Sequence, residues 1–234
     1  MNSIIKKSAS LQGRQLSKKD FIEGRHEQMI VEAGLGHLMP RNPVENRLAT
    51  RDAMVDGAPA GNMIWVFGYG SLIWNPAFEF DEVRTGILHG YHRQFCFWSK
   101  IGRGSPENPG MMLALDYGGS CTGLVLGIQK DKAREELTSV FMREMIGYTY
   151  HAKWGTVKTK KGRVRAITFV ANRLSENYAG RLPLEEVSKY VANGEGHLGP
   201  CADYLFNTIS QLKEFGLNDP MLSKLGGLVK REMF

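Results

Sequence analysis

The sequence has few cysteines and no long apolar run, and both shortages exclude classes of protein. Its three cysteines are an odd number without C-x-x-C spacing, which argues against a disulfide framework and against a zinc ribbon. No apolar stretch approaches the roughly 18 residues that a membrane-spanning helix needs. The opening segment MNSIIKKSAS also lacks the apolar core of a signal peptide. We therefore expect a cytoplasmic protein with no membrane partner.

Metal-binding spacing and clustered basic charge are also missing. The six histidines show no H-x-H or H-E-x-x-H pattern, so the sequence predicts no metal site. The net charge of +6 is compatible with nucleic acid or with a small acidic substrate, but the basic residues are dispersed. Their densest group, KTKKGRVR, falls at the expected turn of a hairpin, where a solvated loop is favoured. Nucleic-acid binding needs a clustered basic face with exposed aromatics, so we expect no nucleic-acid partner.

The first 60 residues differ in character from the rest of the chain. They are polar and contain one helical candidate, SKKDFIEGRHEQMIVEAG, with Ser17 as a possible N-cap and Gly34 as a possible stop. The stretch GAPAG ends this segment just before the first strong strand pattern. We therefore predict an N-terminal, partly helical extension over residues 1–60 and a domain over residues 61–234.

From residue 63 onward, short strand patterns alternate with turns, which indicates a small mixed β-barrel or a strongly curved sheet. One helix is expected between the fourth and fifth strands, because its apolar side chains recur at helical spacing. The fold class is therefore α+β. The predicted strands cover residues 63–70, 80–99, 110–119 and 121–129 and a hairpin over 152–171, and the predicted helices cover 132–148, 183–194 and 202–216.

The stretch WVFGYGSLIW, residues 65–74, bends between two apolar runs. A dinucleotide fingerprint needs a third glycine where Ile73 stands, and a P-loop needs a lysine followed by Ser or Thr, which is absent. A nucleophile elbow needs glycines two residues either side of the serine, but Ser71 has Tyr69 and Ile73 there. What remains is a buried strand that enters a glycine-permitted turn, whose backbone N–H groups can point at a ligand.

Two ionisable groups suggest chemistry, and the residues alone leave each open. Glu144 lies beside the apolar helix face, either partly desolvated or solvent-exposed and paired with Arg143 or Lys153; periodicity alone favours the exposed form. Cys201 begins a helix and follows His197 by four residues, which admits a Cys-His hydrolase. No acidic or amide orienter accompanies that pair, so a buried structural cysteine is favoured.

Four ordered motifs, FGYGSLIW, GYHRQFCFWS, FMREMIGYTYHAKW and GPCADYL, resemble the ChaC-type gamma-glutamylcyclotransferases over roughly residues 62–225. The resemblance implies a compact fold. It also implies an enzyme that cleaves glutathione into 5-oxoproline and cysteinylglycine without metal or cofactor. It implies that backbone groups of a turn hold the gamma-glutamyl moiety, that Glu144 is catalytic, and that Tyr150 binds substrate, with Tyr148 competing for that match. The turn residues are Tyr69, Gly70, Ser71 and Leu72. Arg93 and Tyr204 stay outside this predicted site, because structural roles suit them as well.

The chemistry gives these roles a physical basis. The substrate's alpha-amine lies one five-membered ring closure from the gamma-carbonyl, so the substrate carries its own nucleophile. A carboxylate pKa of about 4.3 against about 7.7 to 8.0 for the amine makes the proton transfer uphill, and burial beside apolar side chains narrows that gap. Alternatives are a cyclotransferase for other gamma-glutamyl amines or dipeptides, and a non-catalytic binder that uses its basic N-terminal segment as a contact surface.

Overall fold

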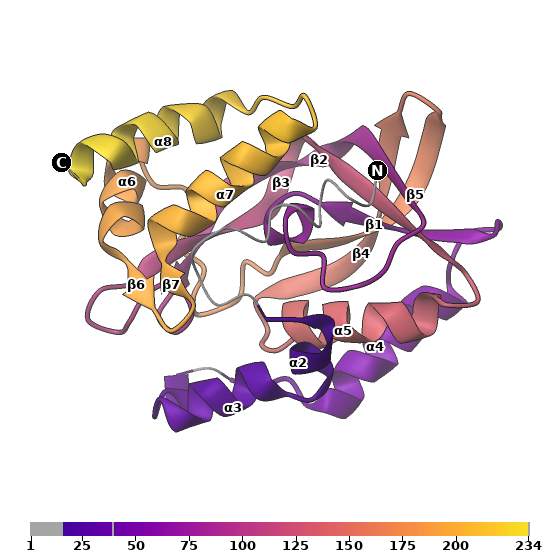
Figure 1. The fold of residues 1–234 in the computed structure, drawn as a ribbon, viewed down its shortest axis with the longest axis horizontal. Coiled ribbons are helices and arrows are strands. Elements are labelled where there is room, and N and C mark those ends of the chain that lie inside the picture. The colour runs from indigo at the N-terminus through magenta and orange to yellow at the C-terminus, as the bar shows by residue number, and fades with distance from the viewer. Residues whose placement is uncertain (1–15, 39, 234) are drawn as a thin grey trace.

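The computed structural model describes residues 16–38 and 40–233. A β-barrel lies at its centre, with helices on two sides (Figure 1). The C-terminal helices α6 (Leu184–Asn193), α7 (Cys201–Glu214) and α8 (Pro220–Glu232) group on one side. The helices α2 (Lys18–Ile22), α3 (Arg25–Glu32), α4 (Val44–Asp56) and α5 (Ala133–Glu144) group on another. No helix within these described ranges has the length and apolar character needed to cross a membrane.

Five strands form the closed barrel, in the order β1-β3-β2-β4-β5, which confirms the predicted small mixed barrel. Apart from an additional parallel pairing of β3 with β5 at Leu115↔Val170, neighbouring strands are antiparallel except where β1 meets β5, in parallel, at Trp65↔Ala166 and Val66↔Ile167. This short parallel contact closes the barrel. The strands are β1 (Met63–Gly68), β2 (Glu82–Ser99), β3 (Gly110–Gln129), β4 (Tyr150–Thr159) and β5 (Gly162–Ala171).

One long strand, β3, replaces the two strands predicted over 110–119 and 121–129, so that prediction is wrong. Gly118 and Gly119 mark a turn in the sequence and have φ angles of +97° and +69°. They lie opposite an irregularity in the pairing of β2 between His89 and Tyr91. Because glycine tolerates this backbone, the chain forms a bulge that bends the strand instead of ending it. The predicted β4–β5 hairpin is confirmed, with Thr159 paired to Gly162.

Helix α5 packs its apolar face on the barrel, as predicted from its spacing. Leu137, Val140 and Phe141 are fully buried, and the Phe141 ring meets Phe169 of β5 edge-on with 5.4 Å between centroids. Helices α6 and α7 also form where predicted. Helix α8 was not predicted, although Asp219 caps it by accepting from the Leu222 N–H at 3.0 Å and proline occupies its first position.

The N-terminal segment differs from its prediction in two ways. The single helix expected over 17–34 is broken into α2 and α3, because Gly24 has a φ of +71°, outside the helical region. Ser17 caps α2 as predicted, accepting from the Asp20 N–H at 3.2 Å. Helix α4 was missed, since only Arg47 and Val55 of it are buried and its apolar pattern is therefore faint.

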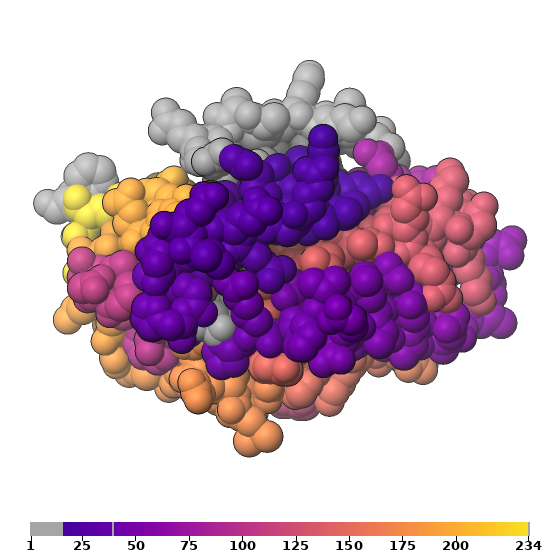
Figure 2. Space-filling model, turned by 90° about the horizontal axis from the view of Figure 1, so that it is seen from below, coloured from indigo at the N-terminus to yellow at the C-terminus, as the bar shows by residue number. Residues whose placement is uncertain are grey.

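Residues 16–38 and 40–56 cover one face of the molecule, seen in indigo and violet in Figure 2. A buried arginine holds this layer together: the Arg47 side chain is 1% exposed and its Nη1 lies 2.6 Å from Glu27 of α3. The same guanidinium donates to the carbonyl of Asn42 at 2.7 Å and of Met142, on α5, at 3.4 Å. Arg47 therefore links α3, α4 and α5.

Replacing Glu27 by glutamine should lower the free energy of unfolding by about 2 kcal/mol, because a buried guanidinium then loses its counter-ion. Urea denaturation measures this change. Glu32, exposed on the same helix, gives the matched control Glu32→Gln, which should shift stability by less than about 0.5 kcal/mol. Equal unfolding midpoints for the two variants would show that the buried pair does not anchor the layer.

Candidate active site

A cavity of about 260 Å³ opens where β1 ends. Its walls come from the turn after β1, the end of β2 and the loop that follows, the end of α5, the start of β4, α7 and the N-terminal segment. The structure brings together at this cavity every residue of the predicted site. These are Tyr69, Gly70, Ser71, Leu72, Glu144 and Tyr150. Tyr148, the competing tyrosine, is 50% exposed and does not line the cavity.

The turn after β1 offers a row of backbone donors. It runs into the short helix η3 (Ser71–Ile73), and the first N–H groups of a helix have no acceptor within it. Among residues 16–38 and 40–233, no acceptor pairs with the N–H of Gly70, Ser71 or Leu72. A Cβ on Gly70 would lie 2.8 Å from the Tyr204 hydroxyl, so any larger residue here would have to displace the buried Tyr204 side chain. Adjacent free N–H groups of this kind suit a carboxylate or a developing oxyanion.

Arg93 fixes that turn from outside the cavity. Its buried side chain forms an ion pair with Asp219, and its Nε donates to the Tyr69 carbonyl at 2.6 Å. Its Nη2 donates to the Thr122 carbonyl at 2.8 Å. In a trans peptide the N–H points opposite to the C=O, so holding the Tyr69 carbonyl also sets the direction of the Gly70 N–H. The structure therefore gives Arg93 a structural ion pair, as the sequence allowed, and places it outside the cavity lining.

Glu144 ends α5, and its side chain is largely covered and paired. Its side chain is 12% exposed, which differs from the exposed carboxylate that periodicity favoured. The expected partner is correct: Arg143 Nε donates to one carboxylate oxygen at 2.7 Å, and Arg143 Nη2 lies 2.7 Å from the same oxygen. Arg143 also donates to the Asn75 carbonyl at 2.7 Å and to the Ser71 hydroxyl at 3.1 Å. One guanidinium therefore ties the carboxylate to the turn.

Three tyrosines complete this part of the cavity. Burial, assisted by the negative charge of Glu144, raises the pKa of Tyr69, Tyr150 and Tyr204 above the ordinary phenol range. Their hydroxyls are therefore neutral at physiological pH. The Tyr150 hydroxyl donates to the Leu113 carbonyl at 3.1 Å, which leaves its oxygen free to accept a hydrogen bond from a ligand.

Cys201 and His197 do not form a catalytic pair. The Cys201 thiol is fully buried and donates to the Met111 carbonyl at 3.0 Å, and burial raises its pKa to about 11. The His197 Nδ1 lies 2.7 Å from the Ile101 carbonyl. A neutral, buried thiol is a poor nucleophile, so the arrangement disfavours the Cys-His hydrolase. Within the part of the chain that the structure describes, no cluster of three or more His, Cys, Asp or Glu offers a metal site.

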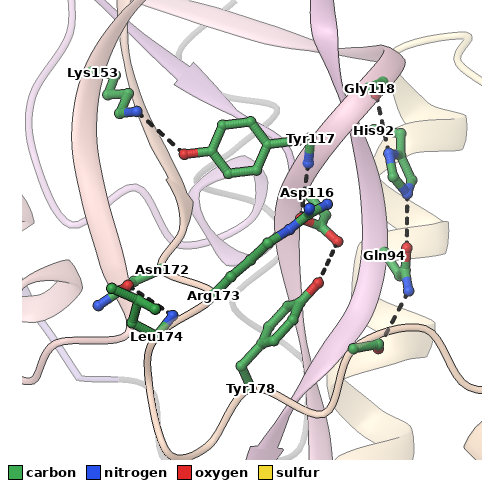
Figure 3. Close-up of polar contacts among 11 residues, drawn as sticks. His92, Gln94, Asp116, Tyr117, Gly118, Lys153, Asn172, Arg173, Leu174 and Tyr178 are labelled. Atoms are coloured by element: carbon green, nitrogen blue, oxygen red, sulfur yellow. Dashed lines mark hydrogen bonds and ion pairs between the residues drawn. The ribbon is translucent and has the colours of Figure 1, made fainter.

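A polar cluster beside the cavity anchors the loop after β5 (Figure 3). Buried Asp116 accepts from Arg173 Nε and from the Tyr178 hydroxyl, each at 2.8 Å. The Tyr178 ring meets Phe97 with 5.5 Å between centroids, and Phe97 meets Tyr150 at 5.7 Å. The cluster therefore supports the wall that carries Tyr150.

Sequence reasoning missed two parts of the cavity. The first is a wall from the N-terminal segment, which includes Phe21 and His26. The second is Arg103, on the loop that joins β2 to β3. Neither belongs to a motif with a chemical signature, so only the folded chain brings them to the site.

The chain is similar to known proteins over most of its length. The ChaC-like protein family model matches residues 64–232. A protein of Escherichia coli (strain K12), named glutathione-specific gamma-glutamylcyclotransferase, is 38% identical over 188 residues, 80% of this chain and 81% of that one. Gamma-glutamylcyclotransferase 2-3 of Arabidopsis thaliana is 32% identical over 71% of this chain and 88% of its own. A crystal structure of a yeast gamma-glutamyl cyclotransferase specific to glutathione has a TM-score of 0.65 at 22% identity, covering 74% of this chain and 97% of its own, and so shares the fold.

Proposed function

Since the chain belongs to the ChaC-like family, we propose that it is a gamma-glutamylcyclotransferase that cleaves glutathione into 5-oxoproline and cysteinylglycine. The observation that carries the proposal is the meeting of the Glu144 carboxylate and the free N–H groups of the Tyr69–Leu72 turn at one cavity. Relatives named for glutathione, at up to 38% identity among those compared, support this substrate.

The reaction needs no nucleophile from the protein. The alpha-amine of the gamma-glutamyl group attacks its own gamma-carbonyl carbon, a new C–N bond closes the five-membered ring, and the C–N bond to cysteine breaks. The alpha-ammonium gives up one proton before the attack and a second after it. Both protons end on the departing cysteinylglycine nitrogen, which leaves as an ammonium group.

Glu144 carries these protons. Its carboxylate takes the proton from the alpha-ammonium, then delivers it to the leaving nitrogen, and it regains its starting state after each turnover. Arg143 holds the carboxylate beside the turn through two contacts of 2.7 Å, so the base is oriented before substrate arrives.

The turn and Tyr150 hold the substrate. The N–H groups of Gly70, Ser71 and Leu72 bind the oxyanion that develops on the gamma-carbonyl oxygen, or the alpha-carboxylate next to it. The neutral Tyr150 hydroxyl accepts a hydrogen bond from the alpha-ammonium, while it donates its own hydrogen to the Leu113 carbonyl. No metal or cofactor takes part in these steps.

We place this activity in the cytoplasm, with no nucleic-acid partner. Cys96, Cys121 and Cys201 are all free and buried, as expected of a chain that works in a reducing compartment. The basic turn of the β4–β5 hairpin carries exposed Lys160 and Lys161 without an aromatic platform on the same turn.

A substrate panel tests the proposal. Purified protein is incubated with glutathione, gamma-glutamylcysteine and gamma-glutamylalanine, and 5-oxoproline is quantified by mass spectrometry. We expect the highest kcat/KM for glutathione. A faster dipeptide would assign the enzyme to another gamma-glutamyl substrate, and glutathione binding without 5-oxoproline from any of the three would make the chain a non-catalytic binder.

A further inference from the structure

Arg103 is a nearly buried cation that has no counter-ion among the described residues. Its residue is 9% exposed and lines the cavity, and within the same ranges its one side-chain hydrogen bond runs from Nη1 to the Pro200 carbonyl at 3.1 Å. Throughout the described ranges, no carboxylate lies within ion-pair distance of it. A guanidinium has five N–H donors, so most of them stay unused here. A desolvated charge of this kind is unfavourable unless an anion from outside the chain completes it.

The unused donors of Arg103 face accessible space. None of its side-chain nitrogens is both fully buried and without a hydrogen-bond partner, in contrast to His26 Nδ1 and His197 Nε2. Since the residue is otherwise buried and lines the cavity, its free N–H groups are open to the cavity. A planar fork of donors at a cavity wall matches a carboxylate, which it can bind through two parallel hydrogen bonds.

The backbone around Arg103 is held rigidly. The Arg103 N–H donates to Ser99 Oγ at 2.9 Å, and the Leu198 N–H donates to the Gly102 carbonyl at 3.0 Å. A Cβ on Gly104 would lie 2.1 Å from both the Gly110 nitrogen and the Ser99 carbonyl oxygen, so the loop closes tightly there. The strands β6 (Glu195–Gly196) and β7 (Gly199–Pro200) carry Leu198 between them and clamp this loop. The guanidinium is therefore positioned before a ligand arrives.

The position of Arg103 also distinguishes between the two carboxylates of glutathione. Arg103 lies on the loop after β2 and donates to the carbonyl that precedes α7. Glu144 ends α5, where Arg143 ties it to the turn after β1. The alpha-amine must reach Glu144, and the alpha-carboxylate is bonded to the same carbon as that amine. The glycine carboxylate is at the opposite end of the tripeptide. A cation on a part of the cavity wall that does not carry Glu144 therefore suits the glycine end.

We propose that Arg103 binds the glycine carboxylate of glutathione and so selects the tripeptide over gamma-glutamyl compounds that lack this group. The inference rests on the proposed function, because it takes glutathione as the substrate. Losing a hydrogen-bonded charge pair of this kind lowers affinity by about 10- to 100-fold. Arg103 thus determines which leaving group is accepted, whereas Glu144 performs the proton transfers for any gamma-glutamyl amine.

The test compares glutathione with its glycine ethyl ester, which keeps the gamma-glutamyl and cysteine parts and removes only the terminal charge. We expect the wild-type protein to prefer the acid by about 10- to 100-fold in kcat/KM. Arg103→Met should abolish this preference by raising KM for glutathione, with the ester turned over at the wild-type rate. Arg163→Met, at an exposed arginine on the β4–β5 hairpin, is the matched control and should keep the full preference.

Equal turnover of acid and ester by the wild-type protein would overturn the proposal, as would an equal loss on both substrates in Arg103→Met. The latter result would assign Arg103 to the alpha-carboxylate. If Arg103→Met does not fold, Arg103→Lys decides, because it keeps the charge and loses the fork: a reduced preference supports the proposal and an unchanged preference refutes it. If the wild type releases no 5-oxoproline at all, the proposed function fails. In that case, calorimetry measures the Kd of glutathione and of its ester for the same variants. The ratio of the two Kd values then tests the role of Arg103.

Discussion

Replacing Glu144 by glutamine should lower kcat for glutathione cleavage by about 10³-fold and leave the protein folded. Glutamine has the size of glutamate, and its carbonyl oxygen can still accept from Arg143, which donates to this side chain at 2.7 Å. It cannot take a proton from the alpha-ammonium or return one to the leaving nitrogen. Proton transfer by a positioned carboxylate contributes about 10² to 10⁴ in rate, and here it serves two steps.

The rate is measured as 5-oxoproline release at saturating glutathione, beside a thermal unfolding curve for each protein. Glu135→Gln is the matched control, because Glu135 lies exposed on the same helix. It should keep wild-type activity. A folded Glu144→Gln protein that retained more than a tenth of wild-type kcat would remove Glu144 from the reaction.

Replacing Arg93 by methionine should lower kcat by about 10²-fold, although Arg93 does not line the cavity. Its Nε holds the Tyr69 carbonyl at 2.6 Å and so directs the Gly70 N–H toward the substrate. Without that contact the Tyr69–Gly70 peptide is free to rotate, and the transition state loses a preorganised donor. The effect should appear in kcat more than in KM, because the donor matters most when charge develops on the carbonyl oxygen.

The variant Asp219→Asn separates this positioning role from stability. It breaks the ion pair with Arg93 and leaves the contact to the Tyr69 carbonyl, and asparagine still caps α8. We expect a lower melting temperature with kcat within about threefold of wild type, since only the charge pair is lost. Equal losses of kcat in Arg93→Met and Asp219→Asn, measured where both are folded, would show that Arg93 acts only through stability.

Much of the barrel was predictable because its elements are strongly periodic. Helix α5 has an apolar face that includes Leu137 and Phe141, and both are buried as expected. The missed helix α4 buries Arg47 through hydrogen bonds, which a search for apolar periodicity cannot detect. The missed helix α8 had visible signals in Asp219 and Pro220. The split at Gly24 and the continuation of β3 depend on the φ angles that the glycines adopt, and tertiary packing determines those angles.

The site was predictable where motifs mark it and not elsewhere. The turn that includes Gly70 and the carboxylate of Glu144 belong to recognisable motifs, and the fold places both at the cavity. Arg93 reaches the Tyr69 carbonyl from 24 positions away, and α8 brings its ion-pair partner Asp219 from 126 positions away. Arg103 and Phe21 come from a loop and from the N-terminal layer, and their convergence depends on tertiary contacts that no local pattern encodes.

The most direct test of the proposed reaction is to run it in water enriched in ¹⁸O and to identify the product of the gamma-glutamyl group, 5-oxoproline or glutamate, and its ¹⁸O content by mass spectrometry. Attack by the substrate's own amine predicts 5-oxoproline without ¹⁸O, together with an equal amount of cysteinylglycine, because no water enters the product. Hydrolysis, whether through Cys201 or by a water that Glu144 activates, would instead give glutamate carrying one ¹⁸O atom. Labelled glutamate as the main product would contradict the cyclotransferase mechanism.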